Sequence, residues 1–199
     1  MSVNVNDQKK LFLEICNDRI HREGLDKLLD WLEKSDFYTA PASTRFHGAY
    51  EGGLCEHSLD VLEQALKLTP MLPQKVESLE SLTIACLFHD ICKVNCYKPD
   101  KRNKKVNGTW VEVPYFSMEE KFHFGGHGSK SVFILQQFMK LTPEEAVAIN
   151  CHMGFSDCGP SGMSDISNAY EQYPLAWLVH VADEAATYLL DRNAEEVIG

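Results

Sequence analysis

Residues 82–93 read Leu-Thr-Ile-Ala-Cys-Leu-Phe-His-Asp-Ile-Cys-Lys. The first seven are apolar on nearly every side of a helix, which is the pattern of a helix buried in a protein core. The stretch then reaches the adjacent pair His89-Asp90, and such side chains are costly in a core unless they are paired or bind a metal. These residues therefore predict a helical core with a functional site at the end of one buried helix.

Further histidines and aspartates lie in, or next to, predicted apolar helices. They are His57, His127, His152 and Asp183. With the His89-Asp90 pair they supply four imidazoles and two carboxylates, a set that suits divalent transition ions better than calcium or a closed structural zinc site. Two neighbouring ions activate a shared water and neutralise phosphoryl oxygens. We therefore expect two divalent metal ions, with manganese, iron, nickel and magnesium left open.

Apolar residues elsewhere recur mostly at helical spacing, and turn residues separate the helices. Asp7 is the expected cap of the first helix, and Thr142 followed by Pro143 is expected to start another. The Gly-, Ser- and Asp-rich segment before Tyr173 is predicted to be a loop. The predicted helices cover approximately residues 7–23, 25–32, 54–68, 76–93, 128–140, 142–153 and 174–191.

One segment departs from the helical pattern. Asn107-Gly108 is a strong turn signal, and the residues from Trp110 to Val113 alternate as in a strand. The sequence therefore predicts an all-α helical bundle with a small β-hairpin flap near residues 94–116. We expect residues 1–42 to form an N-terminal helical extension and residues 43–199 to form the main domain.

Composition indicates the surroundings of the protein. The 199 residues include seven cysteines, an odd number without a Cys-x-x-Cys pair, and no signal peptide is visible. These features indicate a reducing compartment, so we expect a cytoplasmic protein whose cysteines are structural. The longest apolar runs are too short to span a membrane. A formal net charge of −10 disfavours a long nucleic-acid footprint but allows a local basic pocket for a small anion.

The order of the candidate ligands resembles that of a known family. His57, the His89-Asp90 pair and Asp183 match the H…HD…D signature of the HD-domain superfamily of metal-dependent phosphohydrolases. The residues after the pair, Ile-Cys-Lys, resemble the Ile-Gly-Lys of that family. The resemblance covers roughly residues 43–190 and implies the family's helical bundle.

Two further residues, His127 and His152, match the extra histidines of the family's dinuclear members. The resemblance implies that one ion is held by His57, His89, Asp90 and Asp183. Asp90 would bridge to a second ion, which His127 and His152 complete, and a hydroxide between the ions would be the nucleophile. Lys93 would face the substrate phosphate or the metal-bound water, so Asp90 and Lys93 are the expected catalytic residues.

The stretch from His47 to His57 is also similar to the HD domain of certain bacterial 3′–5′ exoribonucleases. Those enzymes carry an OB-fold before the HD domain. Only about forty residues occupy that place here, and they read as helix. The nucleic-acid-binding surface that an OB-fold provides is therefore missing, which argues against exoribonuclease activity.

Other side chains are candidates for binding the substrate, alongside Lys93. Arg45 and Lys130 lie close in sequence to ligand segments and could bind a phosphate. Tyr50 and Tyr115 could stack on a base, although ordinary packing is an alternative that is somewhat favoured for Tyr115. A basic run could attract the substrate or could be a solvated turn. It consists of Lys101, Arg102, Lys104 and Lys105.

Three more histidines lie near the ligand segments. His180 precedes Asp183 by one helical turn and could support that carboxylate, with a packed core histidine as the equal alternative. His47 and His123 flank the ligand segments, and we expect them in the pocket wall.

Together these features predict a dinuclear phosphohydrolase or phosphodiesterase that acts on a small nucleotide or a related phosphate ester. One alternative is a mixed-valent di-iron oxygenase, because such enzymes use the same ligands in the same scaffold. Another is a non-catalytic module that binds nucleotides or partners, with Trp31 and Phe37 as a docking surface. The sequence leaves the oligomeric state open.

Overall fold

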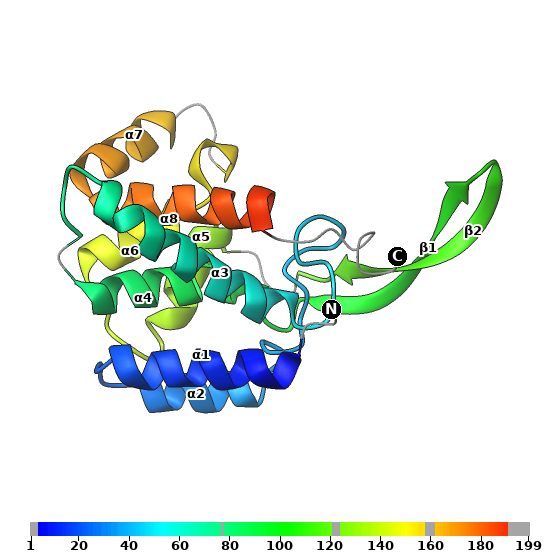
Figure 1. Cartoon of the computed structure of the whole chain (residues 1–199), viewed down its shortest axis with the longest axis horizontal. Helices are drawn as coiled ribbons and strands as arrows, with labels where there is room; N and C mark the ends of the chain where they lie inside the picture. The colour runs from blue at the N-terminus through cyan, green and yellow to red at the C-terminus, as the bar shows by residue number, and fades with distance from the viewer. Residues whose placement is uncertain (1–3, 77, 121–123, 158–161, 191–199) are drawn as a thin grey trace.

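The computed structural model describes residues 4–76, 78–120, 124–157 and 162–190. Within these ranges it contains eight α-helices and one two-stranded antiparallel sheet. Figure 1 shows a helical body from which the sheet projects. The predicted fold class, a helical bundle with a β-hairpin, is therefore confirmed.

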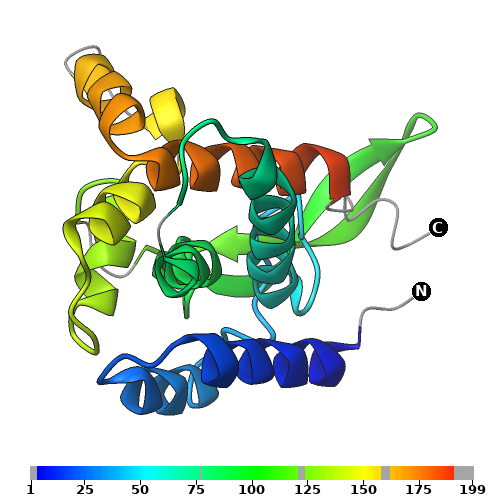
Figure 2. The ribbon, with the colours of Figure 1, turned by 60° about the vertical axis from the view of Figure 1, so that its left-hand side comes forward.

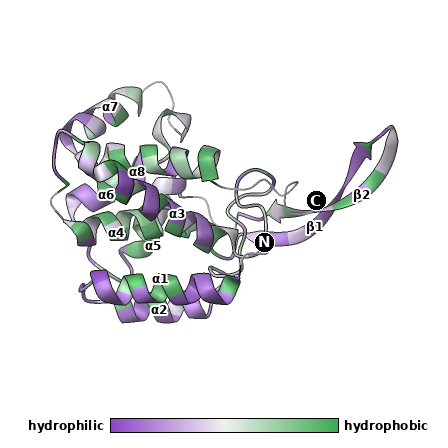
Figure 3. Ribbon diagram, in the orientation of Figure 1, coloured by the Kyte–Doolittle hydropathy of each residue, from purple (hydrophilic) through white to green (hydrophobic). Residues whose placement is uncertain are grey.

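Two helices, α1 (Val5–Arg19) and α2 (Leu25–Glu33), form a layer along one side of the body (Figure 1). The cap of α1 is Asn4, whose side chain accepts a hydrogen bond from the amide of Asn6, so the expected cap at Asp7 was wrong. Figure 3 shows hydrophobic and hydrophilic residues alternating along both helices, as one buried face requires.

The apolar face of this layer joins the main core. Phe12 of α1 packs edge-on against Phe88, with ring centroids 5.8 Å apart. Phe37 is fully buried, and Trp31 packs against Phe138 at 5.4 Å. Phe37 therefore does not contribute to the docking surface considered for Trp31 and Phe37, whereas Trp31 is only half-buried and that part of the hypothesis is not tested.

The centre of the body consists of α3 (Gly53–Leu68), α4 (Leu79–Phe88) and α8 (Pro174–Ala185). Every residue of α4 from Ser81 to Phe88 is buried, as the apolar sequence predicted. The helix is shorter than expected, because Ser78 caps its start and His89 ends it. A 3-10 turn, η2 (Ile91–Lys93), follows at once.

Three further helices complete the bundle: α5 (His127–Leu135), α6 (Pro143–Asn150) and α7 (Met163–Gln172). The start of α6 is as predicted, with Thr142 and Glu145 capping each other's backbone amides. Helix α7 was missed, because its Ser, Asp and Asn residues predicted a loop. It buries only Ile166 and Ala169.

A partly buried ionic cluster ties the N-terminal layer to the bundle. Arg22, between α1 and α2, contacts Glu145 Oε2 at 2.5 Å and Glu80 Oε2 at 3.0 Å. Glu145 is fully buried and also accepts a hydrogen bond from the Ser81 hydroxyl at 2.7 Å. Burial raises the pKa of Glu145, but these donors outweigh it and hold the pKa below its usual value.

The hairpin pairs β1 (Tyr97–Val106) with β2 (Thr109–Met118), from Tyr97 opposite Met118 to Val106 opposite Thr109. Asn107 and Gly108 have positive φ values of 49° and 86°, which suit a two-residue turn between twisted strands. Figure 2 confirms from a second direction that the hairpin extends beyond the helices.

None of the helices in the described ranges has the length and apolar character required to cross a membrane. Most described helices bury their apolar residues against one another in one large cluster, and Ile166 and Ala169 of α7 form a second, small cluster with Cys151.

Candidate metal centre

The His89-Asp90 pair lies where the chain leaves α4 and turns into η2. Both side chains are almost fully buried, with 0% and 3% exposure. The Nδ1 atom of His89 donates a hydrogen bond to the carbonyl of Cys86 at 2.8 Å. Since a carbonyl only accepts, this bond fixes the proton on Nδ1 and leaves Nε2 as a metal-binding donor atom.

Helices α3 and α8 add their candidate ligands to this pair. His57 Nε2 lies 3.3 Å from His89 Nε2 and 3.1 Å from Asp183 Oδ1. His89 Nε2 also lies 3.5 Å from Asp90 Oδ2. Four residues, from α3, α8 and the turn after α4, therefore bring their side chains together, although positions 57 and 183 are far apart in the sequence.

His152 approaches Asp90 from the other side. Its Nδ1 atom donates to the carbonyl of Ile149 at 2.7 Å, and its Nε2 atom lies 3.5 Å from Asp90 Oδ1. Asp90 thus offers Oδ2 to His89 and Oδ1 to His152. A carboxylate with a different histidine at each oxygen has the arrangement that a bridging ligand requires.

The residues fit divalent ions. Asp90 Oδ1 and His152 Nε2 are buried without a hydrogen-bond partner among the described residues, which is costly unless a cation binds them. Two overlapping groups each bring three donor atoms within 4.8 Å of one another. They are His57, His89 and Asp90, and His89, His152 and Asp183. Nitrogen and carboxylate donors of this kind suit manganese, iron, nickel or zinc.

Lys93 places a positive charge beside the bridging carboxylate. Its Nζ atom lies 2.5 Å from Asp90 Oδ2, and its side chain is buried. Burial alone would lower the pKa of Lys93, but Asp90 outweighs it and raises the pKa above its usual value. For Asp90 the effect of burial has the opposite sign and raises the pKa. The positive charges of Lys93 and His89 outweigh burial, so the pKa of Asp90 lies well below its usual value.

Asp183 is stabilised as a carboxylate by histidines. Burial raises its pKa, but the hydrogen bond to His57 and the nearby His89 and His152 lower it far more. A carboxylate and several imidazoles in one buried space thus favour an ionised, cation-binding state.

His127 opens α5, whose Ser131 hydroxyl accepts a hydrogen bond from the Cys92 amide in η2 at 3.2 Å. The helix therefore lies against the turn that carries Lys93. His127 is half-buried and is not part of either three-residue donor group found in the described ranges. Its role as a ligand stays a prediction.

His180 supports a different ligand from the one expected. Its Nδ1 atom donates to the carbonyl of His152 at 2.7 Å, so this donor serves the backbone of His152 and not the carboxylate of Asp183. Its ring stacks on Tyr170 with centroids 5.4 Å apart, and the Tyr170 hydroxyl donates to the Cys151 carbonyl at 3.1 Å. The sequence did not indicate Tyr170, because it falls in the segment that was read as a loop.

The other side of the centre is covered by the loop before α3. The ring of His47 lies 5.0 Å from that of His57, and the Ser43 hydroxyl donates to the His47 carbonyl at 2.7 Å. His47 therefore lies beside the candidate ligands, as expected for a pocket wall. His123 lies outside the described residues.

The expected substrate residues have different surroundings. Tyr50 donates its hydroxyl to Glu56 at 2.5 Å, and the exposed Arg45 lies over its neighbour Phe46. Lys130 is buried and forms an ion pair with Glu120. Tyr115, on the hairpin, donates its hydroxyl to Asp100 at 3.0 Å. Among the four, only Arg45 is exposed.

The cysteines in the described ranges are all buried and unbonded to one another. Burial raises the pKa of Cys92, next to Lys93, to about 12. A buried thiol with a raised pKa is a poor nucleophile, which agrees with the expectation that the cysteines are structural.

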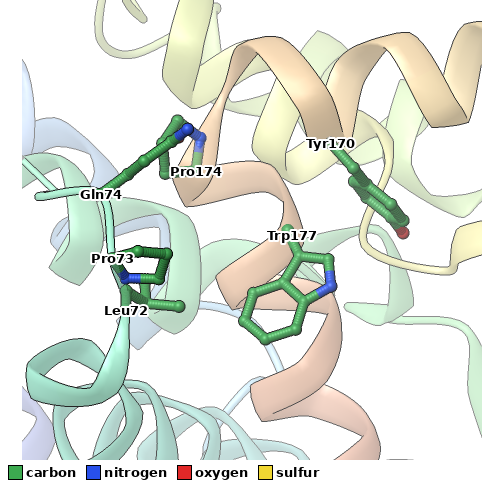
Figure 4. A pocket seen from close by; sticks show the side chains of 6 residues that line it. All are labelled: Leu72, Pro73, Gln74, Tyr170, Pro174 and Trp177. Carbon is green, nitrogen blue, oxygen red and sulfur yellow. The ribbon is translucent and has the colours of Figure 1, made fainter.

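A separate apolar pocket of about 250 Å³ lies at the start of α8, as Figure 4 shows. It is lined by Leu72, Pro73, Gln74, Tyr170, Pro174 and Trp177. None of the candidate ligands lines it. Tyr170 links the two places, because it forms part of this wall and also stacks on His180.

Comparison with known proteins agrees with this geometry. Residues 54–188 match the HD domain. The dihydroneopterin 2′,3′-cyclic phosphate phosphodiesterase of Methanocaldococcus jannaschii is 30% identical over 156 residues. That alignment covers 76% of this chain and 53% of the relative, so the chain spans about half the length of the curated relative it matches.

No solved structure matches the chain. The similarity to bacterial exoribonucleases is not confirmed by these comparisons, whereas the domain match and the phosphodiesterase relative support a metal-dependent phosphohydrolase. The resemblance seen in the order of the histidines and aspartates is confirmed, and the chain belongs to the HD-domain family.

Proposed function

We propose that this protein is a metal-dependent phosphodiesterase that acts on a small phosphate ester. The observation that carries the proposal is the position of Asp90, whose two oxygens face His89 and His152 while Lys93 contacts one of them. A carboxylate shared in this way, with a cation beside it, suits the binding and cleavage of an anionic phosphate group.

We assign the candidate ligands to two ions. His57, His89, Asp90 and Asp183 would hold the first, and Asp90, His152 and His127 the second. Bound divalent ions would supply Lewis acidity and an activated water. The Nδ1 hydrogen bonds of His89 and His152 to backbone carbonyls hold both imidazoles in the tautomer that binds a metal through Nε2.

Lys93 would stabilise negative charge on the phosphate as the ester bond breaks. Its stem is buried in η2, so little side-chain freedom remains to be lost when the substrate binds. The Asp90 contact aims the ammonium at the metal centre.

The candidate substrates come from comparison with the similar protein. The similar protein from M. jannaschii is named for a cyclic phosphodiester attached to a pterin. A nucleoside 2′,3′-cyclic phosphate has the same cyclic ester next to a flat heteroaromatic ring, so both compounds are candidate substrates. Arg45 is exposed and is our first candidate for the phosphate or the ring, ahead of Tyr50, Lys130 and Tyr115, which already have partners.

The test begins with protein stripped of metal by a chelator. Manganese, iron, nickel or magnesium is then added, and hydrolysis of 2′,3′-cyclic AMP, dihydroneopterin 2′,3′-cyclic phosphate and a generic aryl phosphodiester is followed. We expect metal-dependent turnover that Asp90→Asn abolishes, while the matched hairpin variant Asp100→Asn retains it.

Two results would contradict the proposal. Turnover that requires oxygen and iron, and stops under anaerobic conditions with manganese, would indicate the oxygenase alternative. Tight nucleotide binding without turnover in any metal would indicate a binding module.

A further inference from the structure

Within the described residues, the hairpin extends as an arm beyond the helical body. It is a sheet of only two strands that projects from the body (Figures 1 and 2), and such sheets are marginally stable alone. Near its turn, Trp110 is 68% exposed on the face that it shares with its partner Lys105, and Val106 is 42% exposed on the opposite face. Exposed apolar side chains at the end of a projecting arm are typical of an interaction site.

The arm is basic, whereas the chain as a whole is acidic. Residues 97–118 contain five basic and two acidic side chains, and the whole chain has a net charge of −10. In the register of the hairpin, Lys105 lies opposite Trp110, and Lys104 lies opposite Val111. The apolar end is thus flanked by positive charge, and a complementary surface would have an apolar floor and an acidic rim.

A groove with these properties lies between α1 and α3. Its volume is about 390 Å³. The floor is apolar, and Leu11 within it is 47% exposed. The acidic side chains that line the groove are Glu56, Asp60 and Glu63. The apolar side chains are Leu11, Ile15, Leu59, Leu62 and Leu66.

We propose that two copies of the chain form a dimer in which the hairpin of each copy docks in the α1–α3 groove of the other. Reciprocal exchange of arms satisfies twofold symmetry, which is the commonest form of homo-oligomer. A ten-residue strand spans about 33 Å, long enough for an arm to reach across to a neighbouring body.

The test is sedimentation equilibrium of the full chain over a range of concentrations. We expect a dimer, and Trp110→Ser should weaken its association at least tenfold. Trp177→Ser removes a tryptophan from the separate α8 pocket and should leave the association unchanged. Circular dichroism checks that each variant keeps the wild-type helix content, so that loss of folding is not mistaken for loss of the dimer.

A charge exchange tests which surface receives the arm. Lys105→Glu on the arm and Glu63→Lys in the groove should each weaken the dimer, and the two together should restore part of the association. Lys75→Glu, an exposed lysine away from both surfaces, is the matched control. If both single variants weaken the dimer and the double variant does not regain any of the association, the assignment of the groove is overturned.

Other results would overturn the dimer itself. A wild-type chain that is monomeric at all concentrations would do so. So would a monomer that binds single-stranded RNA or anionic phosphatidylserine vesicles through Trp110, because the arm would then serve another partner. A dimer that Trp110→Ser and Lys105→Glu leave unchanged would place the interface elsewhere.

Discussion

The ring of His180 donates from Nδ1 to the backbone carbonyl of His152 at 2.7 Å, while Tyr170 stacks on that ring and bonds to the neighbouring carbonyl of Cys151. Two aromatic residues therefore hold the turn on which a candidate ligand sits. Gly154 fits closely against the same ring, because a Cβ there would lie 2.6 Å from His180 Cε1.

From this relationship we predict that His180→Ala lowers the affinity for metal by about 10- to 100-fold, which is the usual effect of losing a partner behind a ligand. Titration calorimetry with manganese on chelator-treated protein measures it. His21→Ala, far from the centre in sequence, is the control. An unchanged affinity would show that the turn holds its shape without this bond.

Lys93→Met should lower kcat by about 10²- to 10³-fold, because one charged donor is removed from the developing negative charge. KM should change less, since the ligands of the ions stay in place. Lys93→Arg keeps the charge and should retain more activity than Lys93→Met. Equal activity of wild type and Lys93→Met on the best substrate would remove Lys93 from the catalytic residues.

Metal should stabilise the fold in proportion to its concentration. At 100 times the dissociation constant, binding adds about 2.7 kcal/mol to the free energy of unfolding. Differential scanning fluorimetry should therefore show a rise in Tm on adding manganese. His57→Ala should remove most of that rise, and Asp100→Asn should keep it.

The Arg22–Glu145 pair should make stability depend on pH. The folded pKa of Glu145 lies below its ordinary value of 4.5, so its contribution is present above that value and is lost as the pH falls through the folded pKa. Replacing Arg22 by Met leaves a fully buried carboxylate without its cation, which should cost about 3 kcal/mol at pH 7.

Urea unfolding of the wild type and of Arg22→Met at several pH values measures this effect. The difference in the free energy of unfolding should be largest at neutral pH and should narrow below pH 4. A difference that is constant across this range would mean that Glu145 is protonated in both proteins.

The sequence predicted those parts of the fold that depend on local patterns. The apolar run of α4 predicted a buried helix, and Asn107-Gly108 predicted the turn of the hairpin. Thr142 followed by Pro143 marked the start of α6. In each case the residues that decide the structure are neighbours in the chain.

Other features depend on contacts between distant residues. Helix α7 has a polar composition, and only packing against the bundle explains why it is a helix. The bond from His180 to the carbonyl of His152 joins different segments and could not be inferred from the spacing of His180 and Asp183. The partners of Lys130 and Tyr115 could not be predicted either, because Glu120 and Asp100 belong to no recognisable sequence motif.

The candidate ligands extend from position 57 to position 183, and the chain between them passes through nearly the whole bundle. A cation held by residues from both ends would join them in the folded state, so the chain would open far less often while the cation stays bound. The resting concentration of the metal in the cell would therefore regulate how long the polypeptide survives proteolysis, besides enabling its chemistry.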